Sequence, residues 1–203
     1  MTQDAAVRYR ADALINFARA LLQKAGLAAA SAQSVARTLV EGDLLGHDTH
    51  GLALLAGYVK EIESGSMTRD GTPEVVSDRP AAVLWDGKRL PGPWLMQLGM
   101  DLLVPRAREL GTASLVIRRS HHIACLAVYM LRALQEDMLM VLACSDPNAA
   151  SVAPFGGTRA VFTPNPLALG YPLSDGGVMV DISASITTNG MSSRMKAAGR
   201  RGE

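Results

Sequence analysis

The sequence has few cysteines and no excess of charge, and each shortage excludes a class of protein. Only Cys125 and Cys144 occur among 203 residues, which excludes a disulfide framework and indicates a reducing compartment. Twenty Lys and Arg residues are balanced by 19 Asp and Glu residues, so the sequence does not predict the basic surface that a nucleic-acid partner would need. The apolar runs are shorter than the roughly 18 residues of a membrane span. No basic segment followed by an apolar one opens the chain, so we expect a cytoplasmic protein without a membrane partner.

Several well-known catalytic and binding motifs are also absent from the sequence. It contains no G-x-G-x-x-G fingerprint and no P-loop, so a Rossmann phosphate-binding loop is not supported. It has no G-x-S-x-G elbow, which argues against a serine hydrolase, and no C-x-x-C pair that would suggest a closed zinc site.

The pattern of apolar residues predicts two regions of different character. Residues 1–72 show the three-four spacing of amphipathic helices, with Gly26 and Gly65 at expected helix ends. We expect Ser31 to cap the second helix. Residues 73–203 alternate short strands with helices, and Pro105 should kink or shorten one of these helices. The sequence therefore predicts a mixed α+β fold with a boundary near residue 72.

All four histidines of the chain lie in two polar turns, Gly46-His47-Asp48-Thr49-His50-Gly51 and Ser120-His121-His122. Histidine exchanges protons near neutral pH, so the turns are candidate proton-handling sites. Two other interpretations stay open. The histidines could bind a metal, which would make the protein a metal-dependent hydrolase, or the turns could simply cap helices.

Two further segments carry weaker signals for ligand binding. Pro154-Phe155-Gly156-Gly157 and Thr163-Pro164-Asn165-Pro166 bracket a loop in which glycine permits close approach to a ligand. Asp181-Ile182-Ser183 ends a predicted strand, where an acid and a hydroxyl could bind a cofactor ribose.

Taken in order, these motifs resemble the malate/L-lactate dehydrogenase family of the second type, which is unrelated to the Rossmann-fold lactate and malate dehydrogenases. The resemblance runs from about residue 11 to residue 203. The segments that carry it are Gly46–Gly51, Ser120–His122, Ser145-Asp146-Pro147, Val152–Gly157, Asn165-Pro166 and Val180–Ser183.

The resemblance implies an oxidoreductase that uses NAD or NADP to interconvert a small 2-hydroxy acid and its 2-oxo acid. Residues 1–72 would face the substrate, and residues 73–203 would form part of a non-Rossmann cofactor domain with a mixed, largely antiparallel sheet. A homodimer is implied as well. The implied catalytic residues are His50 and His122, with Asp48 to orient an imidazole, and Thr49, His50 and Leu54 would contact the substrate. The implied cofactor contacts are His122, Ser145, Pro154, Gly156, Asn165, Asp181, Ile182 and Ser183.

The sequence departs from the family pattern at four points, one of which is Thr163-Pro164 in place of the usual Gly-Thr before Asn165-Pro166. Leu54 stands where many members have an arginine for the substrate carboxylate, and Ala124 stands where a glycine is usual. Family members also run well over 100 residues further. We therefore expect the chain to end inside a larger domain, and an inactive, truncated binding module is an alternative function.

Overall fold

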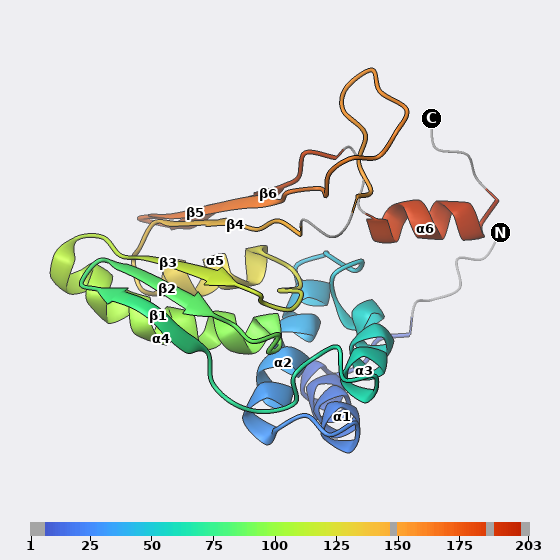
Figure 1. Ribbon diagram of the computed structural model, residues 1–203, viewed down its shortest axis with the longest axis horizontal. Coiled ribbons are helices and arrows are strands. Elements are labelled where there is room, and N and C mark those ends of the chain that lie inside the picture. Colours follow the sequence, from blue (N-terminus) through green and yellow to red (C-terminus); the bar gives the residue numbers. More distant parts are fainter. Residues whose placement is uncertain (1–6, 147–149, 186–188, 200–203) are drawn as a thin grey trace.

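The computed structural model describes residues 7–146, 150–185 and 189–199. A layer of helices lies beside two small sheets (Figure 1). The helices are α1 (Ala11–Lys24), α2 (Ala29–Leu44), the 3₁₀ turn η1 (Leu52–Leu54), α3 (Leu55–Glu63), α4 (Gly92–Leu110), α5 (Ala127–Gln135) and α6 (Asn189–Ala197). The strands are β1 (Glu74–Arg79), β2 (Ala82–Asp86), β3 (Ser114–Arg118), β4 (Met140–Ala143), β5 (Leu167–Leu173) and β6 (Gly176–Ile182).

The first three helices share a core that holds the N-terminal part together. Leu22, Val35, Leu39 and Ile62 are completely buried in it, as their helical spacing predicts. Gly26 ends α1 with a left-handed φ of 105°, as predicted, because L-residues with a side chain rarely adopt this conformation. The helical pattern of the sequence is thus confirmed.

The first sheet pairs β1 with β2 in antiparallel fashion and β2 with β3 in parallel fashion. At the end of β2, the buried carboxylate of Asp86 is ion-paired with Arg118 and Arg119 at 3.0 Å and 2.6 Å. The side-chain hydrogen bond from Arg119 is the main reason why the pKa of Asp86 is lowered to about 2. This cluster fixes the turn that leads from β3 to the second histidine motif.

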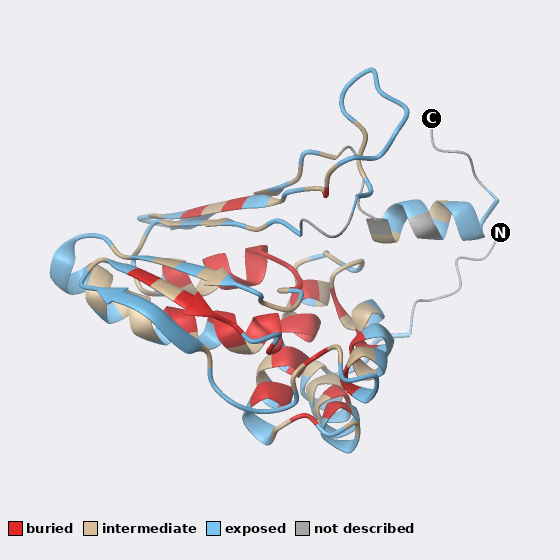
Figure 2. Ribbon diagram, viewed as in Figure 1, coloured by how far each residue is buried: buried red, intermediate tan, exposed pale blue. Residues whose placement is uncertain are grey.

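The second sheet is antiparallel throughout, in the order β4-β5-β6. Helix α5 covers one face of this sheet, where Met130 packs on Ala168 and a Cβ at Gly170 would lie only 3.0 Å from Met130. The other surfaces of the sheet are largely exposed (Figure 2). A mixed α+β fold with a largely antiparallel second part is confirmed.

The structure adds three local details to these expectations. Ser31 does not cap α2, because the helix begins two residues earlier and Ala28 is its N-cap. Pro105 does not shorten α4, which continues to Leu110; residue 105 is exposed, so its ring is accommodated on the solvent side. Strands β3 and β4 are apolar in sequence but half exposed, because each lies at the edge of a three-stranded sheet. Among the described residues, no helix combines the length and apolarity needed to cross a bilayer.

Candidate functional site

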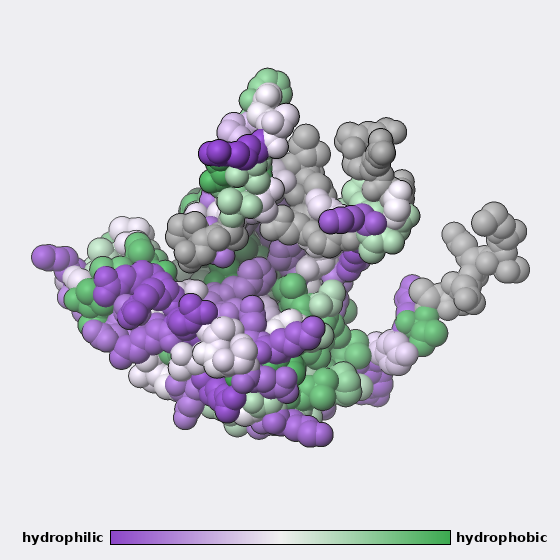
Figure 3. Space-filling model, turned by 45° about the vertical axis from the view of Figure 1, so that its right-hand side comes forward, coloured by the Kyte–Doolittle hydropathy of each residue, from purple (hydrophilic) through white to green (hydrophobic). Residues whose placement is uncertain are grey.

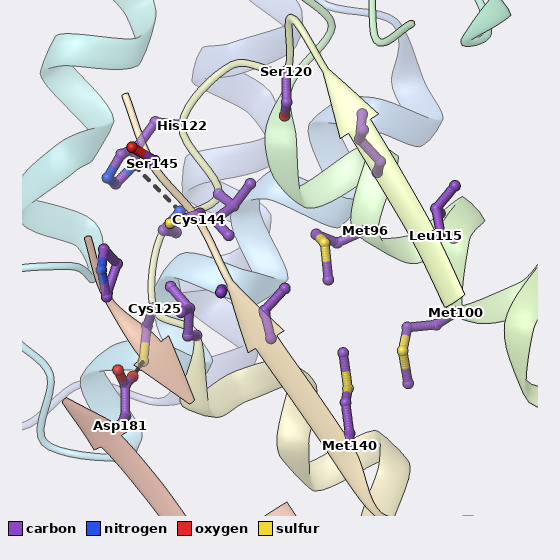
Figure 4. Close-up of a pocket in the computed structure, with 18 of the residues that line it drawn as sticks. Met96, Met100, Leu115, Ser120, His122, Cys125, Met140, Cys144, Ser145 and Asp181 are labelled. Atoms are coloured by element: carbon purple, nitrogen blue, oxygen red, sulfur yellow. Dashed lines mark hydrogen bonds between the residues drawn. The ribbon is translucent and has the colours of Figure 1, made fainter. Parts of the chain in front are cut away.

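A large cleft of about 1810 Å³ is lined by residues of α3, α4 and β3 on one side and of the second sheet on the other. The molecule is hollowed at this place, and hydrophobic side chains are visible inside the hollow (Figure 3). The lining is divided by chemistry. Methionines and leucines gather at one end, and histidines, a serine and an aspartate gather at the other (Figure 4). The labelled residues of the apolar end are Met96, Met100, Leu115 and Met140, and those of the polar end include His122, Ser145 and Asp181.

His50 and His122, which belong to different turns of the sequence, meet at the polar end of the cleft. Their rings are stacked with centroids 5.9 Å apart and an angle of 21° between the planes. Two imidazoles this close disfavour simultaneous protonation, because like charges repel. The pair therefore carries at most one proton charge near neutral pH.

His122 is held in one tautomer by two hydrogen bonds to its Nδ1 atom. The backbone N–H of Ala124 donates to Nδ1 at 3.2 Å, and the hydroxyl of Tyr58 lies 2.7 Å from the same atom. A backbone N–H cannot reverse its direction, so Nδ1 must be the acceptor and Nε2 carries the hydrogen. The pKa of His122 is lowered from 6.5 to about 4, mainly by desolvation and in smaller part by the neighbouring His50 and His121. The ring is neutral at physiological pH.

The chain brings His122 to this place through an unusually close contact. A Cβ atom on Gly92 would lie 2.3 Å from the His122 carbonyl oxygen, so the loop can cross the start of α4 only because residue 92 is glycine. The next turn passes through Ala124, whose φ of 58° is left-handed. Glycine adopts this conformation more readily than alanine, which explains why a glycine is usual at this position in the family that the sequence resembles.

His50 has a different environment from its partner. Its Nδ1 atom lies 2.9 Å from the Thr49 hydroxyl. Burial lowers the pKa of His50, and the negative charge of Asp181 opposes this change. Each ring thus has an anion that stabilises its protonated form, Asp181 for His50 and Asp146 for His122, but desolvation still brings the pKa of His122 to about 4.

Asp48 was expected to orient an imidazole, and in the structure it contacts an arginine. Its carboxylate is ion-paired with Arg194 of α6 at 2.7 Å, and Arg194 also donates to the Asp48 carbonyl oxygen. The contact joins α6 to the histidine turn. Thr49 provides the hydrogen bond to His50 instead.

The side chain of His121 contacts the helical layer, and its environment differs from that of His122. Its Nε2 atom lies 3.2 Å from the Glu61 carboxylate, and its Nδ1 accepts the backbone N–H of His122 at 2.9 Å. These bonds hold the loop in place, so His121 is a positioning residue.

The predicted cofactor residues fall into two groups. Ser145, Asp181, Ile182 and Ser183 line the cleft, and the Ser145 hydroxyl bonds Asn165 at 2.8 Å. Asp181 has an additional structural contact, since it accepts the N–H of Ala127 at 3.0 Å and thereby caps α5.

Pro154 and Gly156 do not join this group, contrary to the expectation from the motif. They lie in a loop that projects from the second sheet, and neither lines the cleft (Figure 1). Phe155 between them is fully exposed. The loop runs outward because Val152 and Phe162 form an isolated bridge at its base.

Two residues of the site were missed from the sequence. Tyr58 is buried and bonds His122, but its position follows the apolar stripe of α3, which predicts a core residue. Cys125 is 2% exposed and lies beside Asp181, and nothing in its sequence neighbourhood indicates this contact.

Comparison with known proteins agrees with this geometry. The sequence profile of the malate/L-lactate dehydrogenase family matches residues 9–202. The chain is 30% identical to malate dehydrogenase from Pyrococcus horikoshii over 184 residues, which cover 91% of the chain and 51% of that protein. It is 31% identical to the Delta(1)-pyrroline-2-carboxylate/Delta(1)-piperideine-2-carboxylate reductase of Pseudomonas aeruginosa over 195 residues, which cover 96% and 58%.

Solved structures agree as well. Malate dehydrogenase from Entamoeba histolytica superposes with a TM-score of 0.90 at 26% identity, over 97% of this chain and 55% of that one. A dehydrogenase from Sinorhizobium meliloti gives a TM-score of 0.86 at 30% identity, over 96% and 57%. The chain belongs to the malate/L-lactate dehydrogenase family, and it spans about half the length of the relatives that it matches.

Proposed function

We propose that the protein is an oxidoreductase that uses NAD or NADP to interconvert a small 2-oxo acid and the corresponding 2-hydroxy acid. The observation that carries the proposal is the stacked pair of His50 and His122 at the polar end of the cleft. The relatives support the class of reaction, since they include malate and sulfolactate dehydrogenases. A homodimer is part of the same proposal.

The polar end of the cleft has the chemistry that a nicotinamide cofactor needs. Ser145, which Asn165 holds in place through a hydrogen bond, offers a hydroxyl for the carboxamide, and Asp181 with Ser183 offers acceptors for ribose hydroxyls. Ile182 would add an apolar contact. When bound, the cofactor supplies or accepts a hydride. These residues do not distinguish NAD from NADP.

The two histidines have different roles in this proposal. His122 is neutral and presents Nε2–H, so it donates a hydrogen bond to the carbonyl oxygen of the substrate and polarises it. Giving up that proton would leave an imidazolate, which is unfavourable. His50, whose protonated form is stabilised by Asp181, therefore transfers the proton to the alkoxide oxygen.

The substrate would lie between these rings and the start of η1. Thr49 fixes His50 through its hydroxyl, and Leu54 is partly buried in the cleft wall, where it offers apolar surface to a substrate side chain. The site should favour 2-oxo acids with apolar side chains.

The proposal is tested by comparing turnover of the native chain with turnover of a His50 variant. The chain is incubated with NADH or NADPH and a panel of 2-oxo acids, and loss of reduced nicotinamide is followed. We expect His50→Gln to reduce kcat by roughly 10²–10⁴-fold, the usual contribution of general acid catalysis. Thr38→Ser, at a buried position of α2 outside the cleft lining, is the control and should retain full activity.

A cyclic 2-imino acid belongs in the panel, because two relatives at 31% and 30% identity are named as reductases of such compounds. A protonated imine brings its own proton, so its reduction would not need His50. If His50→Gln still reduces the cyclic imine, we would conclude that the substrate is the imine and not the 2-oxo acid. Nicotinamide binding without turnover of any substrate would favour the binding module.

A further inference from the structure

Three different ligand-type side chains converge at the polar end of the cleft, from three separate parts of the chain. His47 follows α2, Cys125 precedes α5, and Asp181 lies near the end of β6. One ligand atom from each lies within 4.8 Å of the others. Figure 4 shows the side chains of Cys125 and Asp181 pointing toward one another, with Sγ and Oδ2 separated by 3.9 Å.

The positions of these side chains are fixed by the surrounding backbone. The N–H of His47 bonds the Gly42 carbonyl oxygen at 2.9 Å, and Gly46 has a left-handed φ of 84°, which together form a Schellman end of α2. Asp181 is held by the N–H of Ala127.

Cys125 is buried against α2. A Cβ at Gly42 would lie 3.3 Å from the Cys125 Cβ, so the thiol approaches α2 closely. The three ligands thus need only small side-chain movements to share one ion.

We propose that His47, Cys125 and Asp181 form a zinc-binding site. Imidazole nitrogen, thiolate sulfur and carboxylate oxygen are the donors that zinc takes, and three protein ligands with an open fourth position are typical of its non-structural sites. Calcium and magnesium prefer oxygen ligands alone. The thiolate and the carboxylate together balance the charge of Zn²⁺ in a partly buried place. On binding, the metal displaces the thiol proton, which passes to solvent.

The fourth position of the ion would face the cleft, since all three residues line it together with His50. Bound zinc would then coordinate the Asp181 carboxylate and lie beside the proposed reaction centre. Because Asp181 would no longer be available to the cofactor and His50, zinc should inhibit turnover. This consequence rests on the proposed function, whereas metal binding itself does not.

The test uses Co²⁺ as a spectroscopic probe on the reduced 203-residue chain. We expect binding of one equivalent with a thiolate-to-cobalt charge-transfer band and tetrahedral visible bands, and we expect Zn²⁺ to abolish both. Cys125→Ser should remove the charge-transfer band. Cys144→Ser is the matched control, because Cys144 is the other free cysteine and also lines the cleft, and it should leave the band unchanged.

A second pair of variants keeps the proposal falsifiable if Cys125→Ser does not fold. His47→Gln should weaken cobalt binding at least tenfold, while His121→Gln, whose imidazole contacts Glu61, should not change it. No cobalt binding at millimolar concentration, a spectrum without a thiolate band, or equal effects of the matched variants would each overturn the zinc site.

Discussion

Acid should destabilise this fold through His122, and replacing that imidazole should make the protein less sensitive to acid. The pKa of His122 is lowered from 6.5 to about 4 in the folded protein, mainly by burial. Between these two pH values, the unfolded chain binds more protons at this ring than the folded chain does. Stability therefore falls as the pH drops from about 6.5 toward about 4.

The size of the effect follows from the same two values. A complete transfer between them corresponds to about 3.4 kcal/mol. Because the ring is exposed to the cleft, water screens its charge, and we expect about 1–2 kcal/mol of the free energy of unfolding.

Urea unfolding of the native protein and of His122→Gln, each at about pH 7 and about pH 4.5, measures this contribution. The native protein should lose about 1–2 kcal/mol more than the variant over this range. Carboxylates and the other histidines titrate in both proteins, so their contributions cancel in the difference. Equal losses in the two proteins would refute the assignment of a neutral, desolvated His122. So would an imidazole NMR titration of His122 with its midpoint near the ordinary value of 6.5.

Three further predictions concern the core, the first sheet and the substrate. Leu39→Ala, which empties a completely buried site, should reduce the free energy of unfolding by about 3–5 kcal/mol, as measured by urea titration. Asp86→Asn should lower the melting temperature more than Asp78→Asn does in calorimetry, because Asp86 is fully buried beside two arginines and Asp78 is exposed; equal shifts would contradict this. Leu54→Arg should move the ratio of kcat/KM values from phenylpyruvate toward oxaloacetate, since an arginine can bind the second carboxylate. A native preference for oxaloacetate that the substitution leaves unchanged would show that Leu54 does not contact substrate.

The parts of the structure that the sequence predicted well depend on local pattern. Helices α1 to α3 follow from apolar spacing and from glycines with positive φ at their ends. The position of both histidine turns at element junctions was also readable, because turns and periodic segments are defined by neighbouring residues. The change from helices to strands, expected near residue 72, falls between Glu63 and Glu74.

The parts that the sequence did not predict depend on distant contacts. Asp48 pairs with Arg194, which is 146 positions away, and no local rule connects them. Tyr58 was indistinguishable from an ordinary core residue, because its ring does pack in the helical core and only its hydroxyl reaches His122. The exposure of β3 and β4 depends on which strands lie beside them, which an apolar run does not specify.

The left-handed turn at Ala124 joins two bodies that carry different halves of the proposed chemistry. Before the turn, His122 contacts Tyr58 and Gly92 of the helical layer. After the turn, α5 is joined to the second sheet by the hydrogen bond between Ala127 and Asp181. A rotation at this turn would separate the proton-handling rings from the proposed cofactor contacts, and it would also loosen the packing of Met96 of α4 against Met130 of α5. Displacements near 1 Å cost roughly 10²-fold in rate. Heating should therefore stop turnover through loss of alignment at temperatures where both bodies are still folded.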